Sequence, residues 1–356
     1  MEQAVKKSKG KRIAKIILII LLSLIIVFYI VSFFIVQSVF NDMFGRAEIP
    51  ENSVFYRYED MKEKYPREEV TFKSGENTLT GFIYGNENTK GLVVISHGHG
   101  GYSESYFSET RWFVDNGYKV FAFDNTGSGH SEGDGTTGMA QSVIDLDAAL
   151  TFAESDERLN SLPVFLYGHS WGGYAVTAVL SKGHDIAASV SIAGYDTPMG
   201  IVCEFAEEMI TGPLTIIEYP VLWVSNKIRF GSDANISAVD SINSTDTPVL
   251  IVHGRNDETV EIDGAAIINQ KDKITNPNVQ YYVNDGDHST VFMSEEAGKY
   301  FVETENRGNE IIEKYGDEIP EDIEKEYFES VDKDKISELL PELMDKINDF
   351  YMNSLK

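Results

Sequence analysis

One serine of this chain lies in a setting that would make it a nucleophile. An apolar run from Pro163 leads into Gly168-His-Ser170-Trp-Gly172, and a helical pattern follows directly. This order of strand, sharp turn and helix is the context of the G-x-S-x-G nucleophile elbow. The glycines remove side chains that would collide in a strained turn, and the helix start offers N–H groups to developing negative charge. The pattern predicts a catalytic serine; the alternative is a glycine-rich turn without catalytic function.

A serine hydroxyl is too weakly acidic to attack unaided, and two downstream residues could activate it. Asp257 follows the apolar run 248–253, and His288 follows a second strand-like run, 279–283. Ser, then Asp, then His is the chain order of the α/β-hydrolases. In such a triad, neutral His288 takes the Ser170 proton, while Asp257 fixes the tautomer and stabilises the imidazolium. Taken singly, each could be an ordinary loop residue; together, after an elbow, they predict a triad.

A glycine-rich loop predicts the oxyanion hole. The apolar run 91–96 opens into His97-Gly-His99-Gly-Gly101. Such enzymes supply one oxyanion-hole N–H from this position and another from the residue after the nucleophile. We therefore expect the backbone N–H groups of His99 and Trp171 to act as the pair. The His97 side chain is expected to be structural, and that of His99 could simply line the mouth of the pocket.

Together these motifs resemble α/β-hydrolases of the serine aminopeptidase-type and monoacylglycerol-lipase-like branch, over roughly residues 68 to 300. The matching segments are His97–Gly101, Asp124–Gly133, the elbow at Ser170, His253–Asp257 and Gly286–His288. The resemblance implies the α/β-hydrolase fold and makes the Asp124 loop structural, although Asn125 replaces the Arg that such loops often carry. It leaves the substrate open, because esterases, lipases, thioesterases and peptidases share this skeleton.

The elements that must position these residues alternate between apolar strands and helices, which predicts a doubly wound, mostly parallel sheet. The expected strands are 68–74, 78–85, 91–96, 119–123, the elbow strand and 187–193, and the expected helices include 104–116 and 139–155. Residues 195–247 change the pattern and are expected to form a helical cap. Some apolar residues of the cap could line an acyl pocket or pack the cap onto the core, namely Phe205, Met209, Leu214, Ile217, Leu222 and Trp223.

A membrane segment precedes the catalytic region. Residues 16–36 carry no charge over 21 positions, enough to cross a hydrocarbon core of about 30 Å at about 1.5 Å per residue. Lys and Arg cluster before this segment, so we expect the N-terminus to be cytoplasmic. A cleaved signal peptide would have a shorter apolar run and a small-residue cleavage site, which residues 37–44 lack. We therefore expect an uncleaved signal anchor in a bacterial cell membrane, with the catalytic domain outside.

The expected organisation is a basic tail 1–15, the anchor 16–36, a juxtamembrane segment 37–67, an α/β-hydrolase domain 68–305 and an acidic, amphipathic extension 306–356. The extension either packs on the domain or forms a partner-binding or membrane-lying helix. The chain has 30 Lys and Arg against 57 Asp and Glu, a net charge of −27, which disfavours nucleic acid as a partner. The single Cys203 excludes an intramolecular disulfide, and no Cys and His cluster indicates structural zinc.

The sequence thus predicts a membrane-anchored, extracytoplasmic serine hydrolase. It would cleave small or acyl carboxylic esters through an acyl-enzyme, without a metal or an organic cofactor. A serine peptidase of the aminopeptidase type is one alternative. A catalytically silent surface binding protein is another, and an intact triad argues against it. The acyl chain length, the preference for esters or peptides and the oligomeric state are left open.

Overall fold

A computed structural model describes residues 2–210, 212–316 and 318–355, with side chains from Lys11 onward except that of Pro213. The side chains of Lys6, Lys7 and Lys9 in the expected basic tail lie outside the described residues, as does Asp317 in the acidic extension. The body of the protein is built on one sheet of eight strands in the order β1-β2-β4-β3-β5-β6-β7-β8. β1 and β2 pair antiparallel, β2 joins β4 antiparallel, and all later pairs are parallel.

The strands agree closely with those that the apolar runs predict. Their bounds are β1 Arg67–Ser74, β2 Asn77–Tyr84, β3 Leu92–Ser96, β4 Lys119–Phe123, β5 Val164–His169, β6 Ala188–Ile192, β7 Val249–Gly254 and β8 Val279–Asn284. The central strands are continuous apolar runs because both faces of the sheet are covered. In β3, Leu92 and Val94 belong to the core on one face, whereas Val93 and Ile95 belong to the core on the other.

Helices cover both faces, as the α/β-hydrolase fold requires. The helices that precede β6 in the chain are α2 Tyr58–Met61, η1 Ser103–Tyr106, α3 Phe107–Asp115, α4 Gln141–Ser155, α5 Trp171–Ala178 and η2 Val179–Lys182. The insertion between β6 and β7 contains α6 Pro198–Met209, α7 Gly212–Phe230, η3 Gly231–Asn235 and α8 Ala238–Asn243, and η4 Ile267–Lys273 follows β7. The predicted cap is thus a pair of helices, α6 and α7, with two short elements that return the chain to the core.

The C-terminal extension packs on the body. The expected boundary at residue 305 falls inside α9 Glu295–Tyr315, and the chain continues with α10 Glu321–Glu329, α11 Lys333–Ile336 and α12 Pro341–Ser354. Pro341 begins a new helix, where its missing N–H costs nothing. The apolar face of α12, including Leu343, Ile347 and Tyr351, is buried against the sheet, and Tyr351 Oη donates a hydrogen bond to Leu166 O at 2.7 Å. The helix α12 therefore packs on the domain and is not a free partner-binding or membrane-lying helix.

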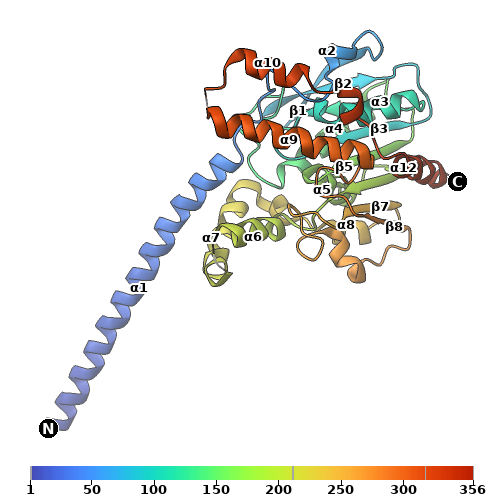
Figure 1. The fold of residues 1–356 in the computed structure, drawn as a ribbon. Coiled ribbons are helices and arrows are strands. Elements are labelled where there is room, and N and C mark those ends of the chain that lie inside the picture. Colours follow the sequence, from blue (N-terminus) through green and yellow to red (C-terminus); the bar gives the residue numbers. More distant parts are fainter. Residues whose placement is uncertain (1, 211, 317, 356) are drawn as a thin grey trace.

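The N-terminal helix α1, Glu2–Met43, projects from the body as a single rod (Figure 1). Its stretch Lys11–Met43 is, within the described residues, the one helix long and apolar enough to cross a membrane. The helix continues past the expected end of the anchor at Val36, so the first part of the expected juxtamembrane segment is helical. Its last turns are docked on the body, because Phe40 and Phe44 are only 5% and 2% exposed.

Candidate active site

The nucleophile elbow has the geometry that its sequence predicts. Ser170 lies between β5 and α5 with φ of 57° and ψ of −116°, a left-handed conformation that is costly for a residue with a side chain. The flanking glycines are required by close backbone approach. A Cβ at Gly168 would lie 2.2 Å from Gly172 O, and one at Gly172 would lie 1.9 Å from Ser96 O. The tight turn leaves Ser170 partly exposed to solvent.

The three predicted triad residues form one hydrogen-bonded chain. Ser170 Oγ lies 2.9 Å from His288 Nε2, and His288 Nδ1 lies 2.8 Å from Asp257 Oδ2 and 3.0 Å from Oδ1. Asp257 follows β7 and His288 follows β8, so the carboxyl ends of parallel strands bring the three loops to one edge of the sheet. Residues 118 positions apart in the sequence are thereby placed at hydrogen-bond distance.

The carboxylate of Asp257 is held in its ionised form. Its side chain is fully buried, and it also accepts hydrogen bonds from the N–H groups of Thr259 and Val260, at 2.9 and 2.8 Å. Burial by itself would raise the pKa of Asp257. The hydrogen bond and the attraction of His288, together with the Val260 N–H, outweigh burial and lower that pKa below its usual value. An anion at this position can orient the imidazole and stabilise its protonated form.

The two predicted oxyanion donors lie beside the nucleophile. Trp171 is the first residue of α5, and a Cβ at Gly98, next to His99, would lie 3.6 Å from Ser170 Cβ. Neither the His99 N–H nor the Trp171 N–H has a hydrogen-bond acceptor among the described residues. Free N–H groups at the start of a helix and in the facing loop are suited to bind an oxyanion.

His97 has the structural position that was expected. It is fully buried, its Nδ1 lies 2.7 Å from Gly98 O, and its Nε2 accepts the Asn125 N–H at 3.0 Å. Burial lowers the pKa of His97, which keeps the ring neutral. The His99 ring is instead held between aromatic edges, with ring centroids 5.7 Å from Trp171 and 5.2 Å from Phe44.

The structure adds two residues that the sequence analysis did not assign, Tyr106 and His169. Tyr106 Oη accepts the Gly98 N–H at 3.1 Å and lies 2.7 Å from His169 Nδ1, while His169 Nε2 lies 2.8 Å from His288 O. Burial lowers the pKa of His169 to about 3, so the ring carries one proton. A carbonyl oxygen can only accept, so that proton is on Nε2, and Tyr106 donates to Nδ1.

This network joins the three loops that carry the site: the oxyanion loop at Gly98, the elbow at His169 and the loop of His288. The one sequence signal for it was a histidine directly before the nucleophile. Tyr106, on η1, gave no such signal, because its hydroxyl reaches the site only after the helix packs on the sheet.

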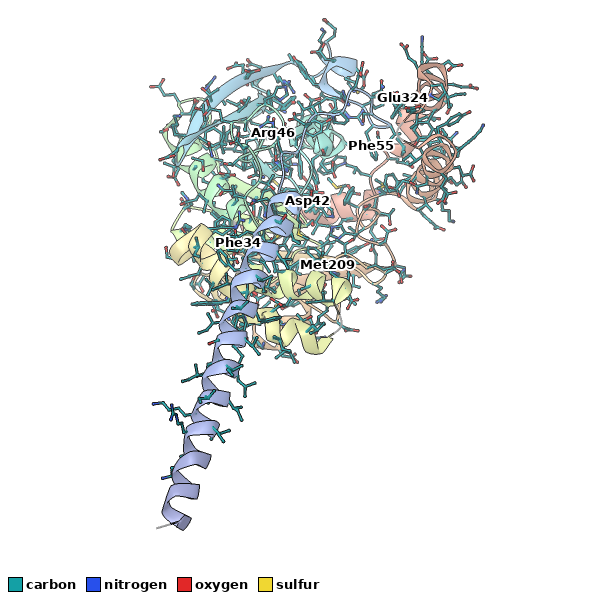
Figure 2. All side chains as sticks on the ribbon, turned by 90° about the vertical axis from the view of Figure 1, so that its left-hand side faces the viewer. Phe34, Asp42, Arg46, Phe55, Met209 and Glu324 are labelled. Atoms are coloured by element: carbon teal, nitrogen blue, oxygen red, sulfur yellow. The ribbon has the colours of Figure 1, made fainter. Side chains whose placement is uncertain are left out.

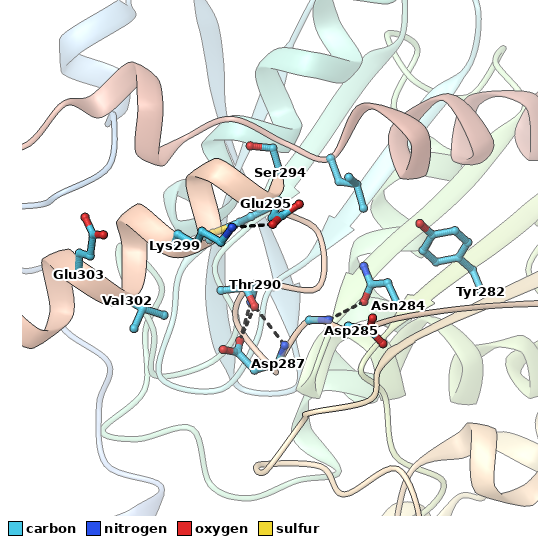
Figure 3. A pocket seen from close by; sticks show the side chains of 14 residues that line it. Tyr282, Asn284, Asp285, Asp287, Thr290, Ser294, Glu295, Lys299, Val302 and Glu303 are labelled. Carbon is cyan, nitrogen blue, oxygen red and sulfur yellow. Dashed lines mark hydrogen bonds and ion pairs between the residues drawn. The ribbon is translucent and has the colours of Figure 1, made fainter.

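One large hollow of the surface is lined by none of the three triad residues. A groove of about 780 Å³ lies between β8 and α9, and its lining includes Asn284, Asp287, Thr290 and Lys299 (Figure 3). A smaller cavity of about 180 Å³ is lined in part by Tyr106, His169 and Ser289, and so lies behind the triad histidine. Across the described parts of the chain, no cluster of three or more His, Cys, Asp or Glu side chains could hold a metal ion.

Comparisons with known proteins agree with this fold. The family described as "Serine aminopeptidase, S33" matches residues 87–198. The protein YfhR of Salmonella typhi, itself uncharacterized, is 25% identical over 248 residues, which is 65% of this chain and 78% of YfhR. Human monoglyceride lipase is 35% identical over 97 residues, or 27% of this chain and 32% of the lipase. A solved esterase of Pyrococcus furiosus superposes with a TM-score of 0.53 at 20% identity, covering 76% of this chain and 98% of the esterase.

An eight-stranded, mostly parallel sheet with helices on both faces and a serine elbow after its fifth strand defines an α/β-hydrolase. The chain belongs to the α/β-hydrolase superfamily, and its family match and its similarity to monoglyceride lipase support a hydrolase.

Proposed function

We propose that this protein is a serine hydrolase that cleaves carboxylic acyl esters. The observation that carries the proposal is the continuous hydrogen-bond chain from Ser170 Oγ through His288 to the buried carboxylate of Asp257. A strained, partly exposed serine at the start of this chain is arranged to attack an acyl carbon.

The geometry supports a two-step reaction. His288 Nε2 takes the Ser170 proton as Oγ attacks the ester carbonyl carbon, and the carbonyl oxygen becomes an oxyanion that the two N–H groups bind. His288 then gives its proton to the leaving alkoxide, and the alcohol departs from the acyl-enzyme. Water attacks next, giving its proton to His288, and the collapse of the second intermediate releases the acid and returns the proton to Ser170.

One of the cap carboxylates, Glu204, is not free to bind the amine of an aminoacyl peptide, whereas Glu207 and Glu208 are exposed. An aminopeptidase needs an anion that is free to bind the substrate amine. Glu204 on α6 is engaged instead, since its carboxyl oxygens accept the N–H groups of Glu261 at 2.8 Å and Ala265 at 2.5 Å. It fastens the cap to the loop after Asp257 rather than facing an open site.

A fluorophosphonate probe tests the proposal, because it labels only an activated serine. We expect labelling of the wild-type protein and none of Ser170→Ala, which deletes one oxygen and keeps both glycines of the turn. A panel of p-nitrophenyl esters and aminoacyl-naphthylamides then separates an esterase from an aminopeptidase. Absence of labelling in folded wild-type protein would show a silent hydrolase-like binding protein instead.

We also propose that α1 anchors the protein in the cell membrane with its catalytic body outside. Lys11, Arg12 and Lys15 lie on one side of the apolar run, whereas Asn41 and Asp42 lie on the other. By the positive-inside rule, the basic side faces the cytoplasm. Protease added to cells stripped of their wall should digest the body of a membrane-bound protein. Recovery of a shortened form from the medium would instead identify a cleaved signal peptide.

A further inference from the structure

The cap helix α7 has an apolar face that neither the core nor a substrate pocket covers. Six of its side chains are between 44% and 77% exposed: Leu214, Ile216, Ile217, Tyr219, Trp223 and Ile228. We call these residues the α7 apolar face. Three of them were expected to line a pocket or to pack the cap onto the core, and they do neither. Of those expected to pack, Leu222 is buried at 7% exposure. A set of large apolar side chains this exposed marks an interaction surface.

The helix α7 runs parallel to α1 and beside it (Figure 2). Tyr29 Oη donates to Ile217 O at 3.3 Å, and Ser32 forms a hydrogen bond with the Glu218 carboxylate. Further along, Gln37 Nε2 donates to Ser225 Oγ at 2.9 Å, and Arg229 donates to Asn41 Oδ1 at 3.0 Å. Three of these four pairs are separated by the same 188 positions, so the two helices keep one register over this length.

The two helices change from apolar to polar at the same level. In α1 the apolar run ends at Val36, and the polar Gln37 follows; in α7 the apolar residues after Glu218 end at Val224, and the polar Ser225 follows. These two boundaries differ by the same 188 positions as the hydrogen-bonded pairs. Before the boundary, α7 carries one charged residue, Glu218; after it come Lys227 and Arg229. Two neighbouring helices with a common polarity boundary indicate one aqueous interface for both.

We propose that α7 lies beside α1 in the outer leaflet of the bilayer, with acyl chains covering the α7 apolar face. The inference rests on the proposed crossing of the membrane by α1. From Gly212 to Val224 the helix is about 18 Å long, close to the half-thickness of a hydrocarbon core. Lys227 and Arg229 then lie among the headgroups, where cations are favoured.

The polar groups at this depth are paired between the helices. Tyr29 and Ser32 are the polar residues of the second half of the uncharged run in α1, and both donate to α7. A polar side chain in hydrocarbon needs such a partner, and hydrogen bonds of this kind hold membrane helices together. The hydrogen bonds explain why polar residues interrupt an otherwise aliphatic anchor.

The end of α7 contacts a loop that lies beside the catalytic serine. At its end, Phe230 packs on Ala140, and Arg229 lies 3.4 Å from Thr137 O. The same loop accepts a hydrogen bond from Trp171 Nε1 at Met139 O, at 2.8 Å. An ester whose acyl chain lies in the bilayer therefore meets the cap first, and the substrate class is a membrane-resident acyl ester.

The position of α7 in the bilayer can be tested by the intrinsic fluorescence of the three tryptophans, without an added label. Trp171 is fully buried, Trp112 is half-buried on α3, and Trp223 is 46% exposed on the α7 apolar face. The full-length protein is reconstituted in phosphatidylcholine vesicles with or without phosphatidylcholine that is brominated along its acyl chains. We expect the brominated lipid to quench the wild type and Trp112→Phe and to leave Trp223→Phe unquenched. The inference is overturned if the wild-type fluorescence is not quenched, or if Trp223→Phe is quenched as much as the wild type. A second chain or a protein partner that covers this face would leave the wild type unquenched.

Extraction at alkaline pH separates this inference from the proposed anchor. Protein that stays in the vesicles but is unquenched retains the anchor and overturns the position of α7 alone. Protein that is released overturns both.

A pair of variants tests the consequence for the substrate. Ile216→Lys places a charge on the most exposed residue of the α7 apolar face, and Ile312→Lys places one at a 55% exposed site on α9. Both should hydrolyse a soluble short-chain ester at the wild-type rate. We expect Ile216→Lys alone to lose several-fold in rate on a long-chain ester presented in vesicles. Equal rates for the two variants on that ester would overturn the membrane-resident substrate.

Discussion

Phe44, directly after the N-terminal helix α1, meets His99 of the oxyanion loop edge to face, with ring centroids 5.2 Å apart. His99 in turn packs on Trp171, whose backbone follows the nucleophile. The residues that follow Phe44 bind a second loop, at Asp124–Gly133: the Ala47 N–H donates to Gly127 O at 2.9 Å, and the Arg46 guanidinium donates to Ser131 O at 2.9 Å. The segment that follows α1 therefore contacts two loops that lie beside the active site.

Phe44→Ala should lower kcat roughly tenfold, because the oxyanion loop loses the ring that supports His99. Loss of a buried phenyl ring also costs about 3–5 kcal/mol of unfolding free energy. Phe40→Ala is the matched control, since Phe40, in the last turn of α1, is 5% exposed and its ring centroid lies 5.4 Å from that of Phe44. Ester turnover and thermal unfolding are measured for both. Equal kcat in the two variants would mean that the contact with His99 has no catalytic effect.

Asp257→Asn should lower kcat by about four orders of magnitude, because the amide cannot stabilise the imidazolium and favours the wrong tautomer. Asp285→Asn is its control: that carboxylate is 84% exposed and pairs with Arg255 at 3.0 Å on the neighbouring loop. Near-normal turnover by Asp257→Asn would assign the triad carboxylate elsewhere.

Tyr106→Phe should reduce kcat by about ten- to a hundredfold and change KM little. The substitution keeps the ring and removes the hydroxyl that accepts from Gly98 and donates to His169. A buried donor or acceptor left without its partner costs about 1–3 kcal/mol, so the unfolding free energy should fall as well. A variant with lower stability and unchanged kcat would limit the network to a structural role.

The kcat/KM for ester hydrolysis should rise with pH from about 5 to 8, because only a neutral His288 can accept the Ser170 proton. Asp257 and His169 do not titrate in this window, since the pKa of each is lowered. A flat profile measured with stable protein would exclude a histidine base.

Glu109 should make the protein less stable as pH rises. Burial raises the pKa of Glu109 to about 7, and its Oε1 has no hydrogen-bond partner among the described residues. The unfolded chain releases this proton near the usual pKa of about 4.3, so the unfolding free energy falls between about pH 4.5 and 7 and then levels. The total change in unfolding free energy is about 4 kcal/mol. In urea titrations at pH 5 and 8, Glu109→Gln should lose most of this difference; an unchanged difference would place its cause in another group.

Local patterns of the sequence determined the elbow, the chain order of the triad and the central strands. Both kinds of feature can be recognised within a few residues of sequence. A glycine is required where a side chain would meet a backbone atom, and a continuous apolar run is required where both faces of a strand are covered. The strand predicted at 119–123 has those bounds, and the helix predicted at 139–155 differs only by its first two residues. The helix predicted at 104–116 is regular over Phe107–Asp115, whereas its start belongs to the 3₁₀ turn η1, from which Tyr106 reaches His169.

Only the tertiary structure decided what covers each apolar face. Periodicity shows that α7 and α12 each have one, but the side chains that meet them come from distant parts of the chain. The face of α12 is buried on the sheet, whereas that of α7 stays exposed beside α1. The contact of Phe44 with His99 and the network of Tyr106 and His169 were equally beyond the sequence. Each joins loops more than 50 residues apart, and their distances are set by the packing of the whole sheet.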